Sequence, residues 1–265
     1  MRASPGQEAR ALGIEGPTVD PREVAKFARH AEDWWNPHGP MRPLHRLNPV
    51  RIAFIRDAAC ERFGREPEIR QPLAGLSLLD IGCGGGLICE PMRRLGAEVV
   101  GIDAGEWGLR VAAAHAAEQG LQIDYRVATA ERLAESGDAF DIVLALEIVE
   151  HVPDRRAFLS AAAALVRPGG LFVLATLNRT PKSFLMAIVG AEYLLRWLPP
   201  GTHAYDKLVR PEEAAADLAA AGLVPSPPVG VEYDLFRDRF ALGSDTGVNY
   251  MVRADRPAEL AIRSD

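Results

Sequence analysis

The sequence predicts an α/β fold, with a doubly wound, mostly parallel sheet of seven strands that is covered by helices on both faces. From residue 76 onward, short apolar runs alternate with helical patterns, and this alternation is typical of parallel sheets. The first of these runs ends in a glycine-rich loop that opens a helix, as nucleotide-type binding loops do. The 265 residues are enough for one such domain with additional segments.

Two helices are expected before the sheet begins. Asp20, Pro21 and Glu23 are typical of a helix start, because they supply an N-cap, a first-position proline and an acid three residues after the cap. A crossing rich in proline and glycine separates this helix from the next one. The predicted segments are a disordered tail over 1–20 and a helical cap over 21–70, with helices over 21–35 and 49–63.

The main domain is predicted over 71–255, and a tail over 256–265 follows it. Its strands are expected at 76–81, 98–102, 123–127, 140–146, 170–177, 229–236 and 248–253, the last two as a hairpin. Its helices are expected at 87–95, 107–119, 153–166 and 211–221. The region 180–209 interrupts the alternation of strands and helices and is interpreted as an insertion that carries one helix.

The composition restricts the classes of partner. A net charge of −6 disfavours nucleic acid, because phosphate-binding proteins need clustered positive charge. The three cysteines have no zinc-site spacing, and such sparse cysteines are typical of a reducing compartment. No apolar stretch reaches the roughly 20 residues of a membrane span, and the N-terminus lacks a signal-peptide core. We therefore expect a cytoplasmic protein, with peripheral contact at the cytoplasmic membrane face left open.

The loop after the first strand has the spacing Asp80-x-Gly82-x-Gly84-x-Gly86. A dinucleotide fingerprint would need a third glycine where this chain has Leu87, so that motif is absent. An acid before the glycines would repel a pyrophosphate and suits a cationic ligand, such as one with sulfonium and ammonium groups. Asp80, Gly82 and Gly84 are therefore candidate cofactor-binding residues.

Two further acids follow the next strands. Asp103 ends the second strand, where a carboxylate can accept hydrogen bonds from both hydroxyls of a ribose. Glu131 follows the third strand and is placed to flank an adenine ring, although helix caps give the same pattern. Together with the loop, these acids predict a site for a sulfonium nucleoside.

At this point the chain resembles class I S-adenosylmethionine-dependent methyltransferases, and more narrowly the O-methyltransferases of ubiquinone biosynthesis. The resemblance covers most of the chain, and its more specific segments lie outside the glycine loop. These segments are Ala31-x-x-Trp34-Trp35, Pro43-Leu44-His45-Arg46-Leu47-Asn48-Pro49-Val50-Arg51, Glu147-x-x-Glu150-His151-Val152-Pro153-Asp154, Leu177-Asn178-Arg179-Thr180, the run from Ile188 to His203, and Val248-Asn249-Tyr250-Met251.

The resemblance implies that Arg51, Gly82, Asp103 and Leu146 contact S-adenosylmethionine, with Arg51 paired to its carboxylate. It also implies a polyprenylated phenol or quinol as the methyl acceptor, two O-methylation steps by one enzyme, and a complex with other proteins of the same pathway. Rival interpretations are an O-methyltransferase of a small soluble phenol, a C-methyltransferase of quinone synthesis, and a cofactor-binding scaffold without turnover.

Glu147, Glu150 and His151 follow the fourth strand and are candidate catalytic or metal-binding residues. In a helical turn, positions i, i+3 and i+4 share one face, so we expect these side chains to converge. They could bind Mg²⁺, which would stabilise a catecholate. Alternatively, His151 could act as a general base, assisted by Glu150. A third interpretation is that Glu150 and His151 only cap the following helix.

A helix is expected over 183–198, with polar and apolar sides. It could lie at a bilayer interface, with Arg179, Lys182, Arg196 and Lys207 near anionic headgroups, or it could form a lid over the active site. We expect it to combine both roles, because the resemblance implies an acceptor that resides in the membrane.

Overall fold

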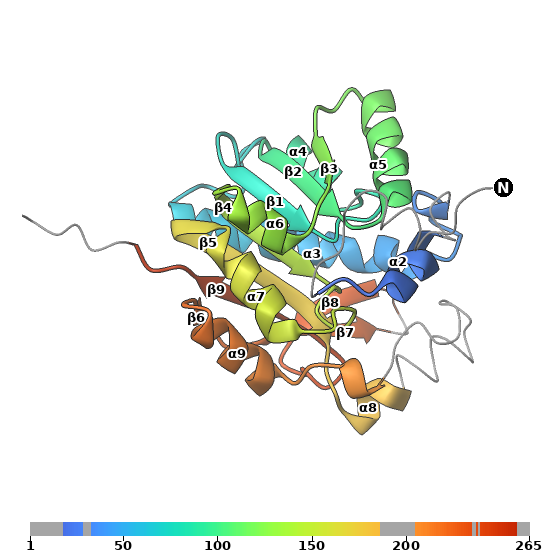
Figure 1. Cartoon of the computed structure of the whole chain (residues 1–265), viewed down its shortest axis with the longest axis vertical. Helices are drawn as coiled ribbons and strands as arrows, with labels where there is room; N and C mark the ends of the chain where they lie inside the picture. Colours follow the sequence, from blue (N-terminus) through green and yellow to red (C-terminus); the bar gives the residue numbers. More distant parts are fainter. Residues whose placement is uncertain (1–17, 29–32, 186–204, 235–236, 238, 259–265) are drawn as a thin grey trace, which may run out of the picture.

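The computed structural model describes residues 18–28, 33–185, 205–234, 237 and 239–258, and these form a mixed sheet of nine strands flanked by helices (Figure 1). The strands pair in the order β3-β2-β1-β4-β5-β9-β7-β8, and β6 pairs with β9. Their bounds are β1 (Ser77–Ile81), β2 (Glu98–Asp103), β3 (Asp124–Val127), β4 (Phe140–Leu146), β5 (Val166–Leu177), β6 (Val224–Pro225), β7 (Val229–Asp234), β8 (Arg239–Gly243) and β9 (Asn249–Asp255).

The predicted fold class is confirmed. The five strands from β3 to β5 are parallel, and β9 is antiparallel to both β5 and β7. All seven predicted strands are present within the described residues, and β7 pairs with β9 as expected. Sequence analysis missed β6 and β8; the connection from β7 to β9 contains β8, which pairs along the other edge of β7.

Most predicted helices are present, with shifted ends. The bounds are α2 (Pro21–Ala28), α3 (Arg42–Phe63), α4 (Cys89–Arg94), α5 (Glu106–Glu118), α6 (Ala130–Glu135), α7 (Arg155–Ala164), α8 (Pro181–Ser183) and α9 (Pro211–Ala220), with a 3₁₀ helix η3 (Tyr205–Lys207). α3 begins seven residues before the predicted start and includes Pro49 in its interior. α6 was not predicted, and Thr129 caps it by accepting a hydrogen bond from the backbone N–H of Arg132 at 3.3 Å.

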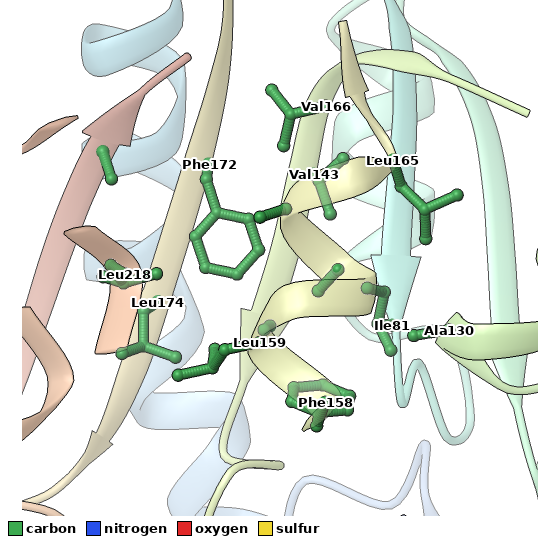
Figure 2. Packing of buried hydrophobic residues seen from close by; sticks show 14 of the residues in the cluster. Ile81, Ala130, Val143, Phe158, Leu159, Leu165, Val166, Phe172, Leu174 and Leu218 are labelled. Atoms are coloured by element: carbon green, nitrogen blue, oxygen red, sulfur yellow. The ribbon is translucent and has the colours of Figure 1, made fainter. Parts of the chain in front are cut away.

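The helices cover both faces of the sheet, as the alternation of strands and helices predicts. On one face, α7 packs Phe158 and Leu159 toward β4 and β5, in a buried cluster that includes Phe172 and Leu174 (Figure 2). On the other face, α3, α4 and α5 contribute to a second buried cluster. This cluster includes Ile55, Met92 and Leu109 from the helices and Leu78 and Leu144 from the strands. The packing leaves the carboxyl ends of the parallel strands at one edge of the sheet.

The N-terminal segment lies against this edge. α2 ends at Ala28, residues 29–32 lie outside the described part, and 33–35 form a turn where sequence analysis predicted helix. Most of the predicted tail and most of the predicted 183–198 helix also lie outside the described residues. In the part that the structure describes, no helix combines the length and hydropathy needed to cross a bilayer.

Candidate active site

The glycine loop follows β1 and is held against the end of β2. The backbone N–H groups of Gly82 and Cys83 donate to the carbonyl oxygen of Ile102 at 2.8 and 3.0 Å. Gly82 and Gly84 have φ values of 73° and 51°, in the left-handed region that favours glycine. A Cβ atom on Gly82 would also collide with the side chain of Ile148. Both positions therefore require glycine, as the predicted cofactor loop does.

Asp103 ends β2 and holds this loop directly. Its carboxylate accepts hydrogen bonds from the backbone N–H of Gly84 at 3.0 Å and of Gly105 at 2.7 Å. Burial raises the pKa of Asp103 above its usual value, although these two N–H groups oppose the shift. Each carboxylate oxygen can accept a second hydrogen bond, so the contacts leave capacity for ribose hydroxyls.

Asp80 lies in the interior beneath the loop, near the end of β1. Its carboxylate accepts a hydrogen bond from the Cys89 thiol, with Oδ2 3.3 Å from Sγ. Burial raises the pKa of Asp80 to about 7, and nearby Asp103 raises it further, whereas Cys89 and Arg51 lower it. The carboxyl group is thus poised to gain or lose a proton near neutrality.

A buried ion pair joins α3 to the residue that follows β4. Arg51 is the one cation in the buried interior of the described residues, and it donates from Nη2 to Oε1 of Glu147. Asn249, at the start of β9, donates from Nδ2 to the same oxygen at 3.1 Å. Arg51 Nε is also buried, with no hydrogen-bond partner among the described residues. This site can therefore take a further anionic group, such as the carboxylate of an amino acid.

Glu150 is shielded from solvent in the turn after β4. Thr176 Oγ1 of β5 donates to its Oε2 at 2.8 Å. Burial is the main cause that raises the pKa of Glu150 well above its usual range, and the neighbouring carboxylate of Glu147 adds to it. Both effects disfavour the ionised form of Glu150.

His151 contacts the N-terminal segment. Its Nδ1 lies 3.1 Å from Oε2 of Glu23 in the first turn of α2. The two side chains are only 11% and 21% exposed. Oε1 of Glu23 lies 3.4 Å from Nζ of Lys207, in η3. Sequence analysis identified Glu23 only as part of a helix start, since nothing local marks a contact across 128 residues.

The expected convergence of Glu147, Glu150 and His151 on one helical face is wrong. The residues after β4 form a turn in which Glu147 has a φ of 52°, and α7 begins only at Arg155. In this turn Glu147 pairs with Arg51 and also contacts Glu150, whereas His151 contacts Glu23. No group of three His, Cys, Asp or Glu side chains suited to a metal ion occurs in the described part of the chain.

The helix-cap interpretation of Glu150 and His151 is also wrong. Asp154 caps α7, because its Oδ1 accepts a hydrogen bond from the backbone N–H of Ala157 at 3.0 Å. The buried position of Glu150 and the contact between His151 and Glu23 therefore need another explanation.

The remaining predicted cofactor residues lie at the same edge. Leu146 ends β4 and is buried. Glu131 lies in the first turn of α6 and accepts a hydrogen bond from Thr18 Oγ1. Thr18 is itself buried, so the segment before α2 reaches the region where an adenine ring was expected.

Two tryptophans of the cap contact the glycine loop. Trp35 Nε1 donates to the carbonyl oxygen of Gly85 at 3.0 Å, and its ring stacks on His115 of α5 at 3.6 Å between centroids. The Trp34 ring lies so close to Gly84 and Gly85 that a Cβ atom at either glycine would collide with it. Sequence analysis named both residues only as part of a family-like segment and did not place them on the loop.

The donor set fits S-adenosylmethionine. The loop allows close approach of a nucleoside, Asp103 can accept from ribose hydroxyls, and the buried cation Arg51 can pair with a carboxylate.

Comparisons with known proteins agree with this geometry. A family model described as "Methyltransferase domain" matches residues 79–174. The "Ubiquinone biosynthesis O-methyltransferase" of Brucella anthropi is 55% identical over 91% of this chain and 97% of the relative. The protein with the same name from a Methylobacterium species is 55% identical over 92% of this chain and 98% of the relative.

Solved structures share the fold at low sequence identity. The magnesium protoporphyrin IX methyltransferase from Synechocystis, with bound SAM, has a TM-score of 0.56 at 16% identity, covering 91% of this chain and all of that one (100%). A possible histamine N-methyltransferase from Thermotoga maritima has a TM-score of 0.56 at 16% identity, covering 89% of this chain and 98% of that one.

Proposed function

The chain belongs to the ubiquinone biosynthesis O-methyltransferases, and on that premise we propose how its sheet edge methylates a phenolic oxygen of a polyprenylated catechol or demethylated quinol. The protein is an S-adenosylmethionine-dependent O-methyltransferase. One observation carries the proposed mechanism. The glycine loop, Asp103 and His151 lie at or just after the ends of the neighbouring strands β1, β2 and β4, at one edge of the sheet.

Bound S-adenosylmethionine supplies a methyl group that is activated by its sulfonium sulfur. Transfer of this methyl group to a phenolic oxygen would break the carbon–sulfur bond and leave the electron pair of that bond on the sulfur. The phenolic proton must also leave, because a free phenol has a pKa of about 10 and is a poor nucleophile near neutrality. The residues of the edge must therefore hold the cofactor and accept that proton.

The cofactor-binding role is assigned to five residues already placed in the structure. Asp103 accepts hydrogen bonds from ribose hydroxyls, Arg51 pairs with the methionine carboxylate, and Gly82 and Gly84 allow the backbone to approach. Leu146 is buried at the end of β4, where it would pack against the bound cofactor. Buried Asp80 contributes negative potential beneath the loop when it is ionised.

We assign the proton acceptor to His151. It follows β4, and its Nδ1 lies within hydrogen-bond distance of the Glu23 carboxylate. Glu150 is given a supporting role, because it is buried in the turn and accepts a hydrogen bond from Thr176 of β5. A positioned general base typically accelerates a reaction by roughly 10²–10⁴-fold.

A Mg²⁺ site would require Glu147, Glu150 and His151 to leave their present partners. Glu147 pairs with Arg51, Glu150 accepts from Thr176, and His151 contacts Glu23. The side chains as arranged do not fit a three-ligand metal site, so the mechanism uses no step at a metal.

The prenyl tail of the proposed acceptor suggests that the enzyme acts at a membrane surface. At the start of the insertion, Phe184 and Leu185 are 46% and 61% exposed, which is unusual for large apolar side chains. Phe184 lies edge-on to Tyr205, with ring centroids 5.7 Å apart. We propose that this apolar group contacts the cytoplasmic face of the membrane and that the enzyme works there, beside other proteins of the pathway.

The basic residues that were expected near anionic headgroups are mostly paired with acidic side chains. Lys182 pairs with Asp245, Arg179 with Glu213, and Lys207 with Glu23. Arg196 lies outside the described residues. Membrane contact in this proposal therefore depends on apolar insertion more than on attraction to anionic headgroups. Flotation with neutral vesicles tests this, because replacing Phe184 and Leu185 with serine should abolish binding.

The decisive experiment is product analysis by mass spectrometry with S-adenosylmethionine and a prenylated catechol. We expect a singly O-methylated product from the wild-type protein and at least 10-fold less from Asp103→Asn. Equal activity on the same catechol without a prenyl tail would favour a soluble phenol as the natural acceptor. Methylation at carbon, or failure to bind S-adenosylmethionine, would contradict the proposed function.

A further inference from the structure

The N-terminal cap supplies a side chain to the reaction site. Glu23 lies in the first turn of α2, and its Oε2 is 3.1 Å from Nδ1 of His151. An ionised carboxylate can only accept hydrogen bonds, so the shared hydrogen lies on Nδ1. Nε2 is then the nitrogen that can accept a proton.

Glu23 is itself held in place from two directions. The backbone N–H groups of Glu23 and Val24 donate to the carbonyl oxygen of Asp20 at 3.1 and 3.2 Å, which fixes the start of α2. On its other side, Lys207 Nζ lies 3.4 Å from Oε1 of Glu23 and 3.9 Å from Oδ2 of Asp20. The carboxylate is therefore anchored to both the cap and the end of the insertion.

The surroundings shield the contact between Glu23 and His151 from water. The Glu23 and His151 side chains are 21% and 11% exposed, and both are held by a turn of the chain. Exposed ion pairs contribute about 0–1 kcal/mol, but shielding from water strengthens the attraction between opposite charges. A carboxylate in this position also stabilises the imidazolium that forms when the ring takes a proton.

From this contact we infer that Glu23 is a positioning residue for methyl transfer, which fixes the tautomer and ring orientation of His151 through Nδ1. The inference goes beyond the proposed function, on which it rests, because it makes a residue of the N-terminal cap necessary for the chemical step. α2 is then part of the catalytic machinery in addition to covering the sheet edge.

The test compares Glu23→Gln, Glu23→Asp and His151→Ala in the full-length protein. We expect Glu23→Gln to lower kcat about 10-fold to 100-fold, as the loss of an orienting partner does elsewhere. KM for S-adenosylmethionine and the calorimetric affinity for S-adenosylhomocysteine should stay within about 2-fold of wild type. Glu23→Asp keeps the carboxylate and should recover part of the lost kcat.

Two matched variants separate positioning from structural support. Arg22→Gln changes an exposed neighbour in the same turn of α2, and kcat should remain at the wild-type level. Lys207→Gln removes the other contact of Glu23 and leaves the Glu23–His151 contact intact, so it should lower kcat less than Glu23→Gln does. Thermal unfolding of each variant shows whether α2 remains docked.

The double variant Glu23→Gln/His151→Ala gives the sharpest outcome. If Glu23 acts through His151, the double variant should be no slower than His151→Ala alone. Full additivity of the two losses would overturn the inference. If kcat falls in His151→Ala but not in Glu23→Gln, only the inference about Glu23 is overturned. If kcat does not fall in His151→Ala, the assignment of His151 as the base, on which the inference rests, is wrong.

Discussion

Asn249 Nδ2 lies 3.1 Å from Glu147 Oε1, the same oxygen to which Arg51 donates. Three distant parts of the chain, namely α3, the turn after β4 and the start of β9, therefore meet at one carboxylate oxygen. Glu147 is the non-glycine residue with positive φ in the described structure, and these two donors hold it there. Strained backbone of this kind is common where a site needs a fixed geometry.

Replacing Arg51 should affect both stability and cofactor binding. Arg51→Met leaves the Glu147 carboxylate without its cationic partner, so we expect the free energy of unfolding to fall by about 3 kcal/mol. Adding Glu147→Gln should recover part of this loss, because the unpaired charge is removed. Urea denaturation measures both effects. The single variant should also bind S-adenosylhomocysteine at least 10-fold more weakly by calorimetry, and unchanged affinity would contradict the role given to Arg51.

Asp103→Asn should weaken cofactor binding more than it weakens the fold. The amide has one acceptor oxygen, so either Gly84 N–H or Gly105 N–H loses its partner, at a cost of about 1–3 kcal/mol. The ribose also loses an acceptor, and we expect at least 10-fold weaker binding of S-adenosylmethionine by calorimetry. An affinity equal to wild type would show that the ribose binds elsewhere.

Gly84→Ala should destabilise the protein more than Gly137→Ala does. Both glycines have positive φ, at 51° and 79°, so both substitutions strain the backbone by about 1 kcal/mol. Only Gly84 also contacts Trp34, whereas a Cβ atom on Gly137 meets open space. The difference in unfolding free energy between the two variants therefore measures the contact with the indole. Adding Trp34→Ala should remove most of that difference, and equal losses in the single variants would contradict the contact.

Asp80 should make stability fall as the pH rises from about 4 to about 7. Burial raises its pKa in the folded protein from an ordinary value of 3.8 to about 7. In this range the folded state binds more protons than the unfolded state, so the linkage slope is negative. Asp80→Asn removes this contribution. The unfolding free energy of wild type relative to the variant should therefore decline across this range, and a flat difference would refute the shift.

Removal of divalent cations should leave methyl transfer largely intact. The mechanism proposed here depends on His151 as a base, and the described side chains form no three-ligand metal group. We expect dialysis against a chelator to preserve at least half of the initial rate with a prenylated catechol. A rate that falls below about one tenth and returns on addition of Mg²⁺ would instead show that these side chains rearrange around a metal ion.

The sequence predicted those parts of the site whose signals are local. Gly82 and Gly84 lie in one short loop, and Asp103 ends a strand whose apolar pattern is clear. The turn over 147–151 could not be predicted, because a spacing of three and four residues indicates a helical face only where the backbone is helical. At Glu147 the backbone adopts a φ of 52°, which tertiary contacts with Arg51 and Asn249 support.

Other features were missed because they depend on long-range packing. The contact between Glu23 and His151 joins residues that are far apart in the sequence, and the segment around Glu23 gives no sign of it. β8 is an edge strand with mostly intermediate or exposed residues, so it lacks the alternation of buried and exposed positions that identifies strands. α6 has only six residues, too few for a helical period to be recognised.

The two indoles that contact the glycine loop should report ligand binding through their intrinsic fluorescence. Trp34 contacts Gly84 and Gly85, and Trp35 donates to the carbonyl oxygen of Gly85 while stacking on His115. A nucleoside entering beside that loop changes the polarity around both rings, so their fluorescence should follow occupancy without an added label. Stopped-flow emission would then time the arrival of the methyl donor and the departure of its demethylated product.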